Sequence, residues 1–286
     1  MSRANIATWL APFFARPIAL AGLCVLVAMV IAAIFAPSLA PYDPYAIHPM
    51  IRLMPPDAAH WFGTDQYGRD TLSRAIYSAR MALLIGSGVV FFALITGIPV
   101  GVFSALFPRL GHVLMRMVDV LMAFPSLLLA LGLIVILGPS AANSILAIGA
   151  GYMTTTTRII YGLTLRLRAE TYVEASRSMG SGTIWLVVKH ILPNLISPLL
   201  VQASFVFAFA QLGAASLDFL GLGAPPDIPS WGNMLAESRT FITRAPWLLT
   251  FPGMMIVLTA FSLNLVGDAL RDRLDPRFRQ AFGGEG

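Results

Sequence analysis

Lysine is almost absent from this chain, because Lys189 is the only one among its 286 residues. The phosphate-binding loop of many ATPases requires the pattern G-x-x-x-x-G-K-[ST]. Lys189 follows Val187 and Val188 and precedes His190, so it does not belong to such a loop. The chain therefore cannot hold ATP in that way, and if ATP drives its activity, another subunit hydrolyses it.

Cysteine and the common catalytic patterns are scarce as well. Cys24 is the only cysteine, so no disulfide framework is possible, and its apolar surroundings indicate a small hydrophobic role. The zinc pattern H-E-x-x-H and the nucleophile pattern G-x-S-x-G are both absent. The histidines fall in separate segments, at His48, His60, His112 and His190. We expect no catalytic residue, no metal site and no cofactor bound by this chain.

Charge is also sparse, at 12% of the residues, where a soluble domain has about 25%. Hydrophobic residues make up 57%, and the mean hydropathy is +0.76. This composition predicts an all-α polytopic membrane protein that contacts lipid. The net charge of +5 comes from basic residues scattered between apolar runs, which argues against a nucleic-acid surface.

Six apolar runs are long enough to cross a bilayer, and they predict six transmembrane helices. The runs are 18–35, 81–107, 118–137, 144–163, 196–220 and 248–266. The first is longer than the apolar part of a signal peptide, so we expect it to remain uncleaved. We divide the chain into an N-terminal tail, first span and outer segment (1–80) and a core of five spans (81–286). Glycines at 86, 88, 97 and 101 are predicted sites of close helix packing.

The basic residues predict the orientation of these spans. With the N-terminus inside, six of the 19 basic residues fall outside: Arg52, Arg69, Arg74, Arg80, Arg239 and Arg244. The other thirteen lie in or beside the cytoplasm, as the positive-inside rule requires. Both termini and the polar segment 170–193 are therefore predicted to be cytoplasmic, and the segment 37–80 periplasmic.

The polar segment 170–193 has the pattern of two short helices. Tyr172, Ala175, Ser176 and Met179 recur at the spacing of one helix face, and Glu170 and Glu174 lie in the first turns. Gly180 is a candidate for the left-handed residue that ends this helix. A second helical run, 183–191, is predicted to stop at Pro193. On pattern alone, the segment is either a solvated connector or a docking element.

A family resemblance favours docking. Glu174–Ala175–Ser176, then Gly180, then Ile191–Leu192–Pro193 resembles the EAA loop of ABC-importer permeases, with Ser176 in place of the second alanine and His190 in place of isoleucine. In that family the loop is a coupling helix that docks on an ATPase subunit. The resemblance implies coupling contacts at Glu170, Tyr172, Glu174, Ala175, Ser176, Met179, Gly180 and Pro193.

Four further stretches resemble permeases of the dipeptide, oligopeptide and nickel group. They are GTDQYGRDTLSRAIYSAR (63–80), AFPSLLLA around Pro125, FLGLGAPPDIPSWGNML (219–235) and NLVGDALRDRLDPR (264–277). The resemblance implies a type I ABC importer permease fold in the bacterial inner membrane. It also implies that the chain forms half of a translocation pathway, with a second permease, two ATPase subunits and a periplasmic binding protein as partners.

The substrate stays open at this point, because the binding protein selects it in this family. Dipeptides, oligopeptides, glutathione-like peptides and nickel chelates all fit the resemblance. A secondary transporter is the weaker alternative, because it would need an intramembrane ion relay. The acidic residues that border the spans, Asp119, Asp218 and Asp268, lie at span ends instead.

Polar residues within the spans are candidates for the pathway. They are Thr154, Thr155, Thr156 and Thr157 in the fourth span and Gln202 and Gln211 in the fifth. The threonines either pack helices together or line an aqueous path, and the sequence does not decide between the two.

Asp119 is predicted to pair with Arg116 one turn earlier. The charges Asp65, Arg69, Asp70, Arg74 and Arg80 are interpreted as a solvated, ion-paired lead-in to the second span, rather than a catalytic cluster.

Overall fold

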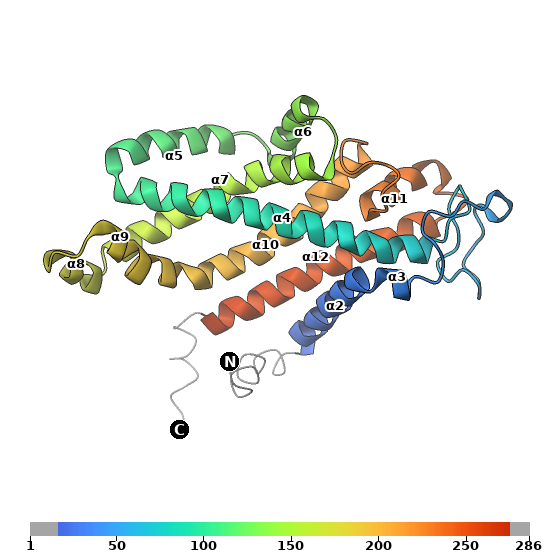
Figure 1. Ribbon diagram of the computed structural model, residues 1–286, viewed down its shortest axis with the longest axis horizontal. Helices are drawn as coiled ribbons and strands as arrows, with labels where there is room; N and C mark the ends of the chain where they lie inside the picture. Colours follow the sequence, from blue (N-terminus) through green and yellow to red (C-terminus); the bar gives the residue numbers. More distant parts are fainter. Residues whose placement is uncertain (1–16, 275–286) are drawn as a thin grey trace, which may run out of the picture.

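The computed structural model describes residues 17–274, and it is helical almost throughout (Figure 1). The helices are α2 (Pro17–Ile34), α3 (Ala36–Leu39), α4 (Thr71–Leu106), α5 (Pro108–Met122), α6 (Ser126–Leu137), α7 (Ala141–Arg168), α8 (Thr171–Ser178), α9 (Thr183–Leu186), α10 (Leu192–Phe219), α11 (Trp231–Ser238) and α12 (Trp247–Leu274). Short 3-10 turns lie at Pro49–Ile51 and Arg239–Phe241, and a π-helical turn lies at Val187–Ile191. Within 17–274 no β-strand forms, so the predicted all-α class is confirmed.

Most of the predicted spans correspond to single long helices. Within the described residues, α2, α4, the continuous helix 183–219 and α12 are long and apolar enough to cross a membrane, and α5 with α6 forms a fifth, broken candidate. The helix α7 has 28 residues, so it is about 42 Å long, but its threonines and arginines lower its hydropathy. Composition alone therefore supports four or five of the six predicted spans.

The third predicted span is wrong in shape. Instead of one helix over 118–137, α5 and α6 meet at an angle of 92°. Pro125 explains the break, because it lacks an N–H and disfavours helical backbone at Phe124 before it. Pro108, in turn, occupies the first turn of α5, where a proline is well tolerated. The stretch 108–117, which separates the second and third predicted spans, is therefore the first part of a helix.

Glycines bring α4 and α7 into close contact, as predicted. A Cβ atom on Gly88 would lie 2.7 Å from Ile145, and one on Gly101 would lie 2.8 Å from Ile160. A larger side chain at either position would clash at these separations, so the glycines let the backbones of α4 and α7 approach more closely than larger residues would. The partners advance together along both helices, which shows that α4 and α7 run in the same direction.

Other helix pairs run in opposite directions. Ile148 of α7 lies beside Gly213 of α10, whereas Ile160 shares a buried cluster with Leu195. In the same way, α2 and α12 are antiparallel, because Gly22 meets Leu265 and Met29 contacts Thr259. These directions agree with spans that alternate across a bilayer.

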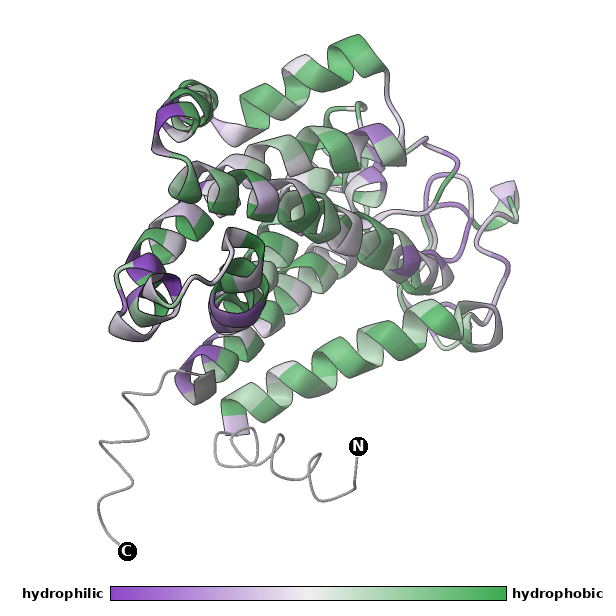
Figure 2. Cartoon of the chain, turned by 60° about the vertical axis from the view of Figure 1, so that its left-hand side comes forward, coloured by the Kyte–Doolittle hydropathy of each residue, from purple (hydrophilic) through white to green (hydrophobic). Residues whose placement is uncertain are grey.

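Polar segments collect at opposite ends of the helices. Figure 1 places α8 and α9 at one end and the segment 40–70 with α11 at the other. In Figure 2 the lengths of the helices are mainly hydrophobic, and hydrophilic colour concentrates in α8 and in the loops. This arrangement separates two candidate functional regions by the length of the bundle.

Candidate coupling and pathway sites

The end of α8 has the geometry that the sequence predicted for Gly180. Its φ is +88°, in the left-handed region that favours glycine. The N–H of Gly180 donates to Arg177 O at 3.0 Å, and the N–H of Ser181 donates to Ser176 O at 3.2 Å. These two bonds form a Schellman motif, which satisfies carbonyls at the end of the helix. Gly180 therefore ends α8 and reverses the chain direction.

The second half of the segment differs from the prediction at Pro193. Instead of stopping there, the chain continues from α9 through a π-helical turn into α10, and Pro193 lies in the first turn of α10. The N–H of Leu192 donates to Val187 O, five residues back. Because proline cannot donate a hydrogen bond and its ring crowds the preceding turn, a widened turn accommodates it without breaking the helix. The end of the polar segment is thus continuous with a membrane helix.

The predicted face of α8 is divided between two environments. Tyr172, Ala175 and Met179 are exposed, and Met179 retains 81% of its surface. Ser176 is buried instead, and its Oγ lies 3.0 Å from Ser181 Oγ. The small size of Ser176 therefore serves packing within this chain.

The acidic residues of this segment are open to solvent. Glu170 is the N-cap of α8 but makes no side-chain capping bond, and Glu174 lies in the first turn of the helix. Both are exposed. Their carboxylates therefore remain available to a positively charged partner surface.

A large groove adjoins α8, with a volume of about 710 Å³. Its lining includes Phe107 at the corner between α4 and α5, Arg168 at the end of α7, and Glu174 and Arg177 of α8. The guanidinium of Arg168 donates to Ala105 O, which ties the end of α7 to the end of α4. The segment 170–193 therefore contains an exposed helix beside a groove whose lining includes charged side chains.

Three of the four consecutive threonines are buried within the chain. Thr154 donates its hydroxyl to Gly151 O at 2.7 Å. Thr156 and Thr157 pack against Gly97 of α4, where an added Cβ would lie 3.1 Å from Thr156 Cγ2 and 3.3 Å from the backbone of Thr157. Thr155 alone among the four is exposed. The run therefore combines a packing face with one outward hydroxyl.

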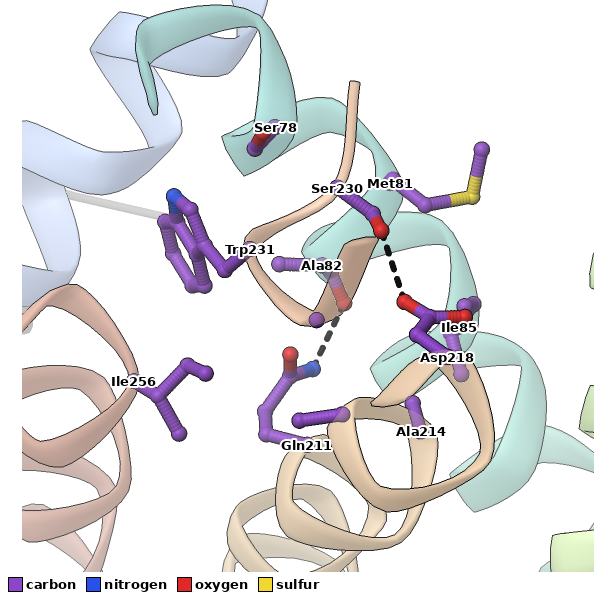
Figure 3. A pocket seen from close by; sticks show the side chains of 12 residues that line it. Ser78, Met81, Ala82, Ile85, Gln211, Ala214, Asp218, Ser230, Trp231 and Ile256 are labelled. Carbon is purple, nitrogen blue, oxygen red and sulfur yellow. Dashed lines mark hydrogen bonds between the residues drawn. The ribbon is translucent and has the colours of Figure 1, made fainter. Parts of the chain in front are cut away.

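The glutamines of α10 also lie in different environments. Gln202 is partly buried, whereas Gln211 is buried and donates its side-chain amide to Ala82 O of α4 at 2.6 Å (Figure 3). A cavity of about 20 Å³, with room for about one water molecule, lies beside Gln211. Gln211 therefore joins two helices of this chain, and only a small internal space adjoins it.

Asp218 shapes the loop that follows α10. Its carboxylate accepts a hydrogen bond from Ser230 Oγ at 2.7 Å (Figure 3). It also accepts the N–H of Ala224 at 2.7 Å. Trp231, at the start of α11, donates its indole N–H to Ala75 O of α4 at 3.0 Å. These bonds fix α11 against both α4 and α10.

An ion-pair network at the same end was only partly predicted. Arg69 contacts Asp65 at 2.5 Å and Glu237 at 2.7 Å, and Arg74 lies 3.4 Å from each of these carboxylates. The ion pairing is confirmed, but the expected solvation is wrong, because Arg74 is 1% exposed and Asp65 5%. Glu237, contributed by α11, was missed because nothing local in the sequence connects it to this segment. Burial raises the pKa of the Glu237 carboxyl, and the charge of Arg69 opposes that shift.

The remaining two charges of that lead-in have separate roles. Asp70 caps α4 by accepting the N–H of Ser73 at 2.7 Å, and His60 Nδ1 lies 2.9 Å from its other oxygen. Arg80 donates to Ala33 O of α2 at 2.7 Å. These contacts attach the segment before α4 to the first turn of that helix, and they join α4 to α2.

A second ion pair lies within the spans. Asp119 of α5 pairs with Arg158 of α7, so the predicted pairing with Arg116 is wrong. Both partners are close to half exposed, at 40% and 45% of their side-chain surface. An arginine or aspartate at the centre of a spanning helix costs about 2.5–3.5 kcal/mol on insertion scales, so contact of the pair with lipid is unfavourable.

Comparison with protein families matches most of the chain. Residues 97–280 match the binding-protein-dependent transport system inner membrane component family. Residues 7–56 match the N-terminal TM domain of oligopeptide transport permease C.

Curated relatives match along nearly the full length. The dipeptide transport system permease protein DppC of Escherichia coli strain K12 is 43% identical over 269 residues, which cover 92% of this chain and 90% of that protein. The di/tripeptide transport system permease protein DppC of Pseudomonas aeruginosa is 43% identical over 270 residues, covering 92% and 89%. A putative peptide transport system permease protein of Brucella suis is 42% identical over 258 residues, covering 90% and 87%.

Among solved structures, the inward-facing MetNI methionine ABC transporter has a chain of the same fold. The TM-score is 0.61 at 18% identity, and the alignment covers 71% of this chain and 97% of that one. The expected ABC importer permease fold is therefore confirmed.

Proposed function

The chain belongs to the binding-protein-dependent transport system inner membrane component family, and on that premise we propose that it carries short peptides across the bacterial inner membrane. It is a permease subunit of an ABC importer. Peptides are the substrate class favoured here, because the relatives from Escherichia coli, Pseudomonas and Brucella are named as peptide or dipeptide permeases.

The proposed complex contains further subunits. A second permease would complete the pathway, two ATPase subunits would hydrolyse ATP, and a periplasmic binding protein would deliver the peptide. The absence of a phosphate-binding lysine supports the assignment of ATP hydrolysis to other subunits. We expect this chain itself to be non-catalytic and to bind no cofactor.

The coupling role rests on the exposure of α8 and on its connection to a membrane helix. In the proposed mechanism, Glu170, Tyr172, Glu174, Ala175 and Met179 of the segment face an ATPase subunit, and all five are exposed. Movement of α8 would pass to α9 and from there into α10, because α9, the π-helical turn and α10 form one continuous helix over 183–219. A rigid element with two alternative positions can then expose the pathway to either side of the membrane.

The function is tested by transport in a reconstituted complex. Proteoliposomes with all subunits should accumulate a labelled dipeptide only when both ATP and the loaded binding protein are supplied. Nickel chelates and glutathione-like peptides serve as competing substrates. Uptake of one of these in place of dipeptides would correct the substrate, and uptake without any ATPase subunit would overturn the importer mechanism in favour of a secondary transporter.

A further inference from the structure

The sequence predicted Arg158 in or beside the cytoplasm and Asp119 at the end of a span, but the packing of α7 against α4 places this ion pair within the apolar part of the bundle. Thr156 and Ile160 pack against Gly97 and Gly101, so Arg158, between them on α7, is level with the middle of that part of α4. This level lies inside the apolar stretch 81–107. The ion pair is therefore several residues from either end of the stretch, where charged side chains normally face protein or water.

The same face of α7 carries other groups that suit an aqueous surface. Thr155 and Gly162 lie three residues before and four residues after Arg158, which places all three along one helix face. Thr155 is exposed, and an added Cβ on Gly162 would meet no atom of the described chain within 4 Å. The neighbouring hydroxyls of Thr154, Thr156 and Thr157 are buried against α4 or their own helix. The outward polarity is thus confined to one narrow strip.

We propose that this strip, formed by Thr155, Arg158 and Gly162 of α7 with Asp119 of α5, lines the translocation pathway and provides a transient site for the charged ends of a peptide. The inference rests on the proposed function, because the pathway is completed by the second permease. A peptide with free termini carries an ammonium and a carboxylate group. Asp119 can accept the ammonium and Arg158 can bind the carboxylate with two parallel hydrogen bonds.

The pairing of the two residues explains why such a site would be transient. While no peptide is present, each charge neutralises the other, so neither is left unpaired inside the span. A zwitterionic peptide replaces one internal ion pair by two pairs of the same kind, so the total charge of the site remains zero. Passage requires a site that binds strongly enough for entry and weakly enough for release. Exchange between internal and substrate pairing meets both requirements.

The accessibility of the strip can be measured with cysteine substitutions. Cys24 is the only native cysteine, so Cys24→Ser provides a cysteine-free chain with one change. Thr155→Cys and Gly162→Cys test the strip in that background, and Thr156→Cys is the matched buried control on the adjacent position. The probe is a membrane-impermeant, positively charged thiosulfonate reagent, applied to the complete complex with ATPase and binding-protein subunits.

The expected result is labelling of Thr155→Cys at least tenfold faster than Thr156→Cys, and slower labelling when saturating dipeptide is loaded. If Thr155→Cys and Gly162→Cys are both unreactive in complexes that transport normally, the strip is covered by the second permease or by lipid, and the proposal is wrong. Labelling that dipeptide does not slow would remove the peptide-binding part. Failure of the unmodified complex to transport any peptide would instead refute the proposed function, because labelling does not depend on transport.

Charge variants separate a substrate-binding role from a structural one. Arg158→Gln and the double variant Asp119→Asn/Arg158→Gln should each lower dipeptide transport at least tenfold, with ATP hydrolysis stimulated by the binding protein within twofold of the unmodified complex. Arg116→Gln, which removes an exposed cation one turn from Asp119, is the control and should transport within twofold. If the double variant transports normally, the pair only joins α5 to α7, and its assignment to peptide recognition fails.

Discussion

Replacing Gly180 by valine should uncouple ATP hydrolysis from transport. Gly180 has a φ of +88°, and a Cβ added at this position would meet no atom of the described chain within 4 Å. Steric clash inside this chain is therefore absent, and the intramolecular cost arises from the backbone alone. Valine resists positive φ because it is branched at Cβ.

The size of this effect follows from the backbone conformation. A residue other than glycine in the left-handed region costs roughly 1–2 kcal/mol, and a β-branched residue lies at the upper end. Such a cost lowers the population of the correct helix end about 5- to 30-fold. The Schellman bonds of Gly180 and Ser181 would be lost in the same fraction of molecules. Because α8 leads into the membrane helix through α9, this loss should misplace the docking surface without unfolding the spans.

The assay compares variants of this loop in the assembled complex. Gly180→Val should lower peptide transport and stimulated ATP hydrolysis together, about tenfold, with subunit assembly and binding-protein loading unchanged. Gly180→Asn should retain more activity, because asparagine tolerates the left-handed region, and its remaining loss measures the effect of bulk at the docked surface. Gly182→Ala is the control, since Gly182 has a φ of −67° and open space around it. Normal transport by Gly180→Val in an assembled complex would show that the segment is only a connector.

Other expectations concern the ion network, its titration and the orientation of the chain. Arg74→Met should lower the free energy of unfolding by about 3–5 kcal/mol, because Asp65 and Glu237 would lose a buried cation. Arg52→Met, at an exposed site, is the control. If Arg74→Met lowers the thermal midpoint no more than Arg52→Met does, this expectation is wrong. Because the pKa of the Glu237 carboxyl is raised in the folded state, the contribution of this residue to the free energy of unfolding is greatest at low pH. That contribution is lost as the pH rises from the ordinary pKa of the carboxyl through the raised pKa. Glu237→Gln should flatten that part of the stability profile in detergent-purified protein. A reporter fused after Gly180 should score cytoplasmic and one within 43–57 periplasmic, and either opposite score would overturn the predicted orientation.

Local rules predicted the features of this fold that depend on neighbouring residues. The left-handed end of α8 follows from a glycine after a short amphipathic run, and the tight α4–α7 contact follows from glycines spaced along an apolar helix. Both depend on the conformational and steric properties of a single residue type. The cap on α4, where the Asp70 carboxylate accepts the N–H of Ser73, is equally local, but it was not predicted, because Asp70 was interpreted as part of a solvated, ion-paired lead-in.

Features that depend on the tertiary arrangement could not be predicted in this way. Arg69 and Glu237 are 168 residues apart in sequence, and only the seating of α11 against α4 brings them together. Asp119 had a cation at helical spacing, Arg116, but the packing of α5 against α7 places Arg158 beside it instead. Proline also affects the helices differently at two positions. Pro125 accompanies a bend of 92° between α5 and α6, whereas the helix continues through Pro193, which follows a π-helical turn.

The position of α10 explains how a single chain can connect its two polar ends. Its 28 residues are about 42 Å long, enough to reach from the end of the segment 170–193 to the start of α11. At one end it continues from α9, and at the other Asp218 holds Ser230, the residue that caps α11. Gln211 attaches the same helix to α4 at Ala82. Because packed helices shift as units rather than deform continuously, a displacement of α8 would move α10 and therefore the seat of α11. The buried network of Arg69, Arg74 and Glu237 then limits that motion, since α11 cannot separate from the segment before α4 without exposing or unpairing these charges.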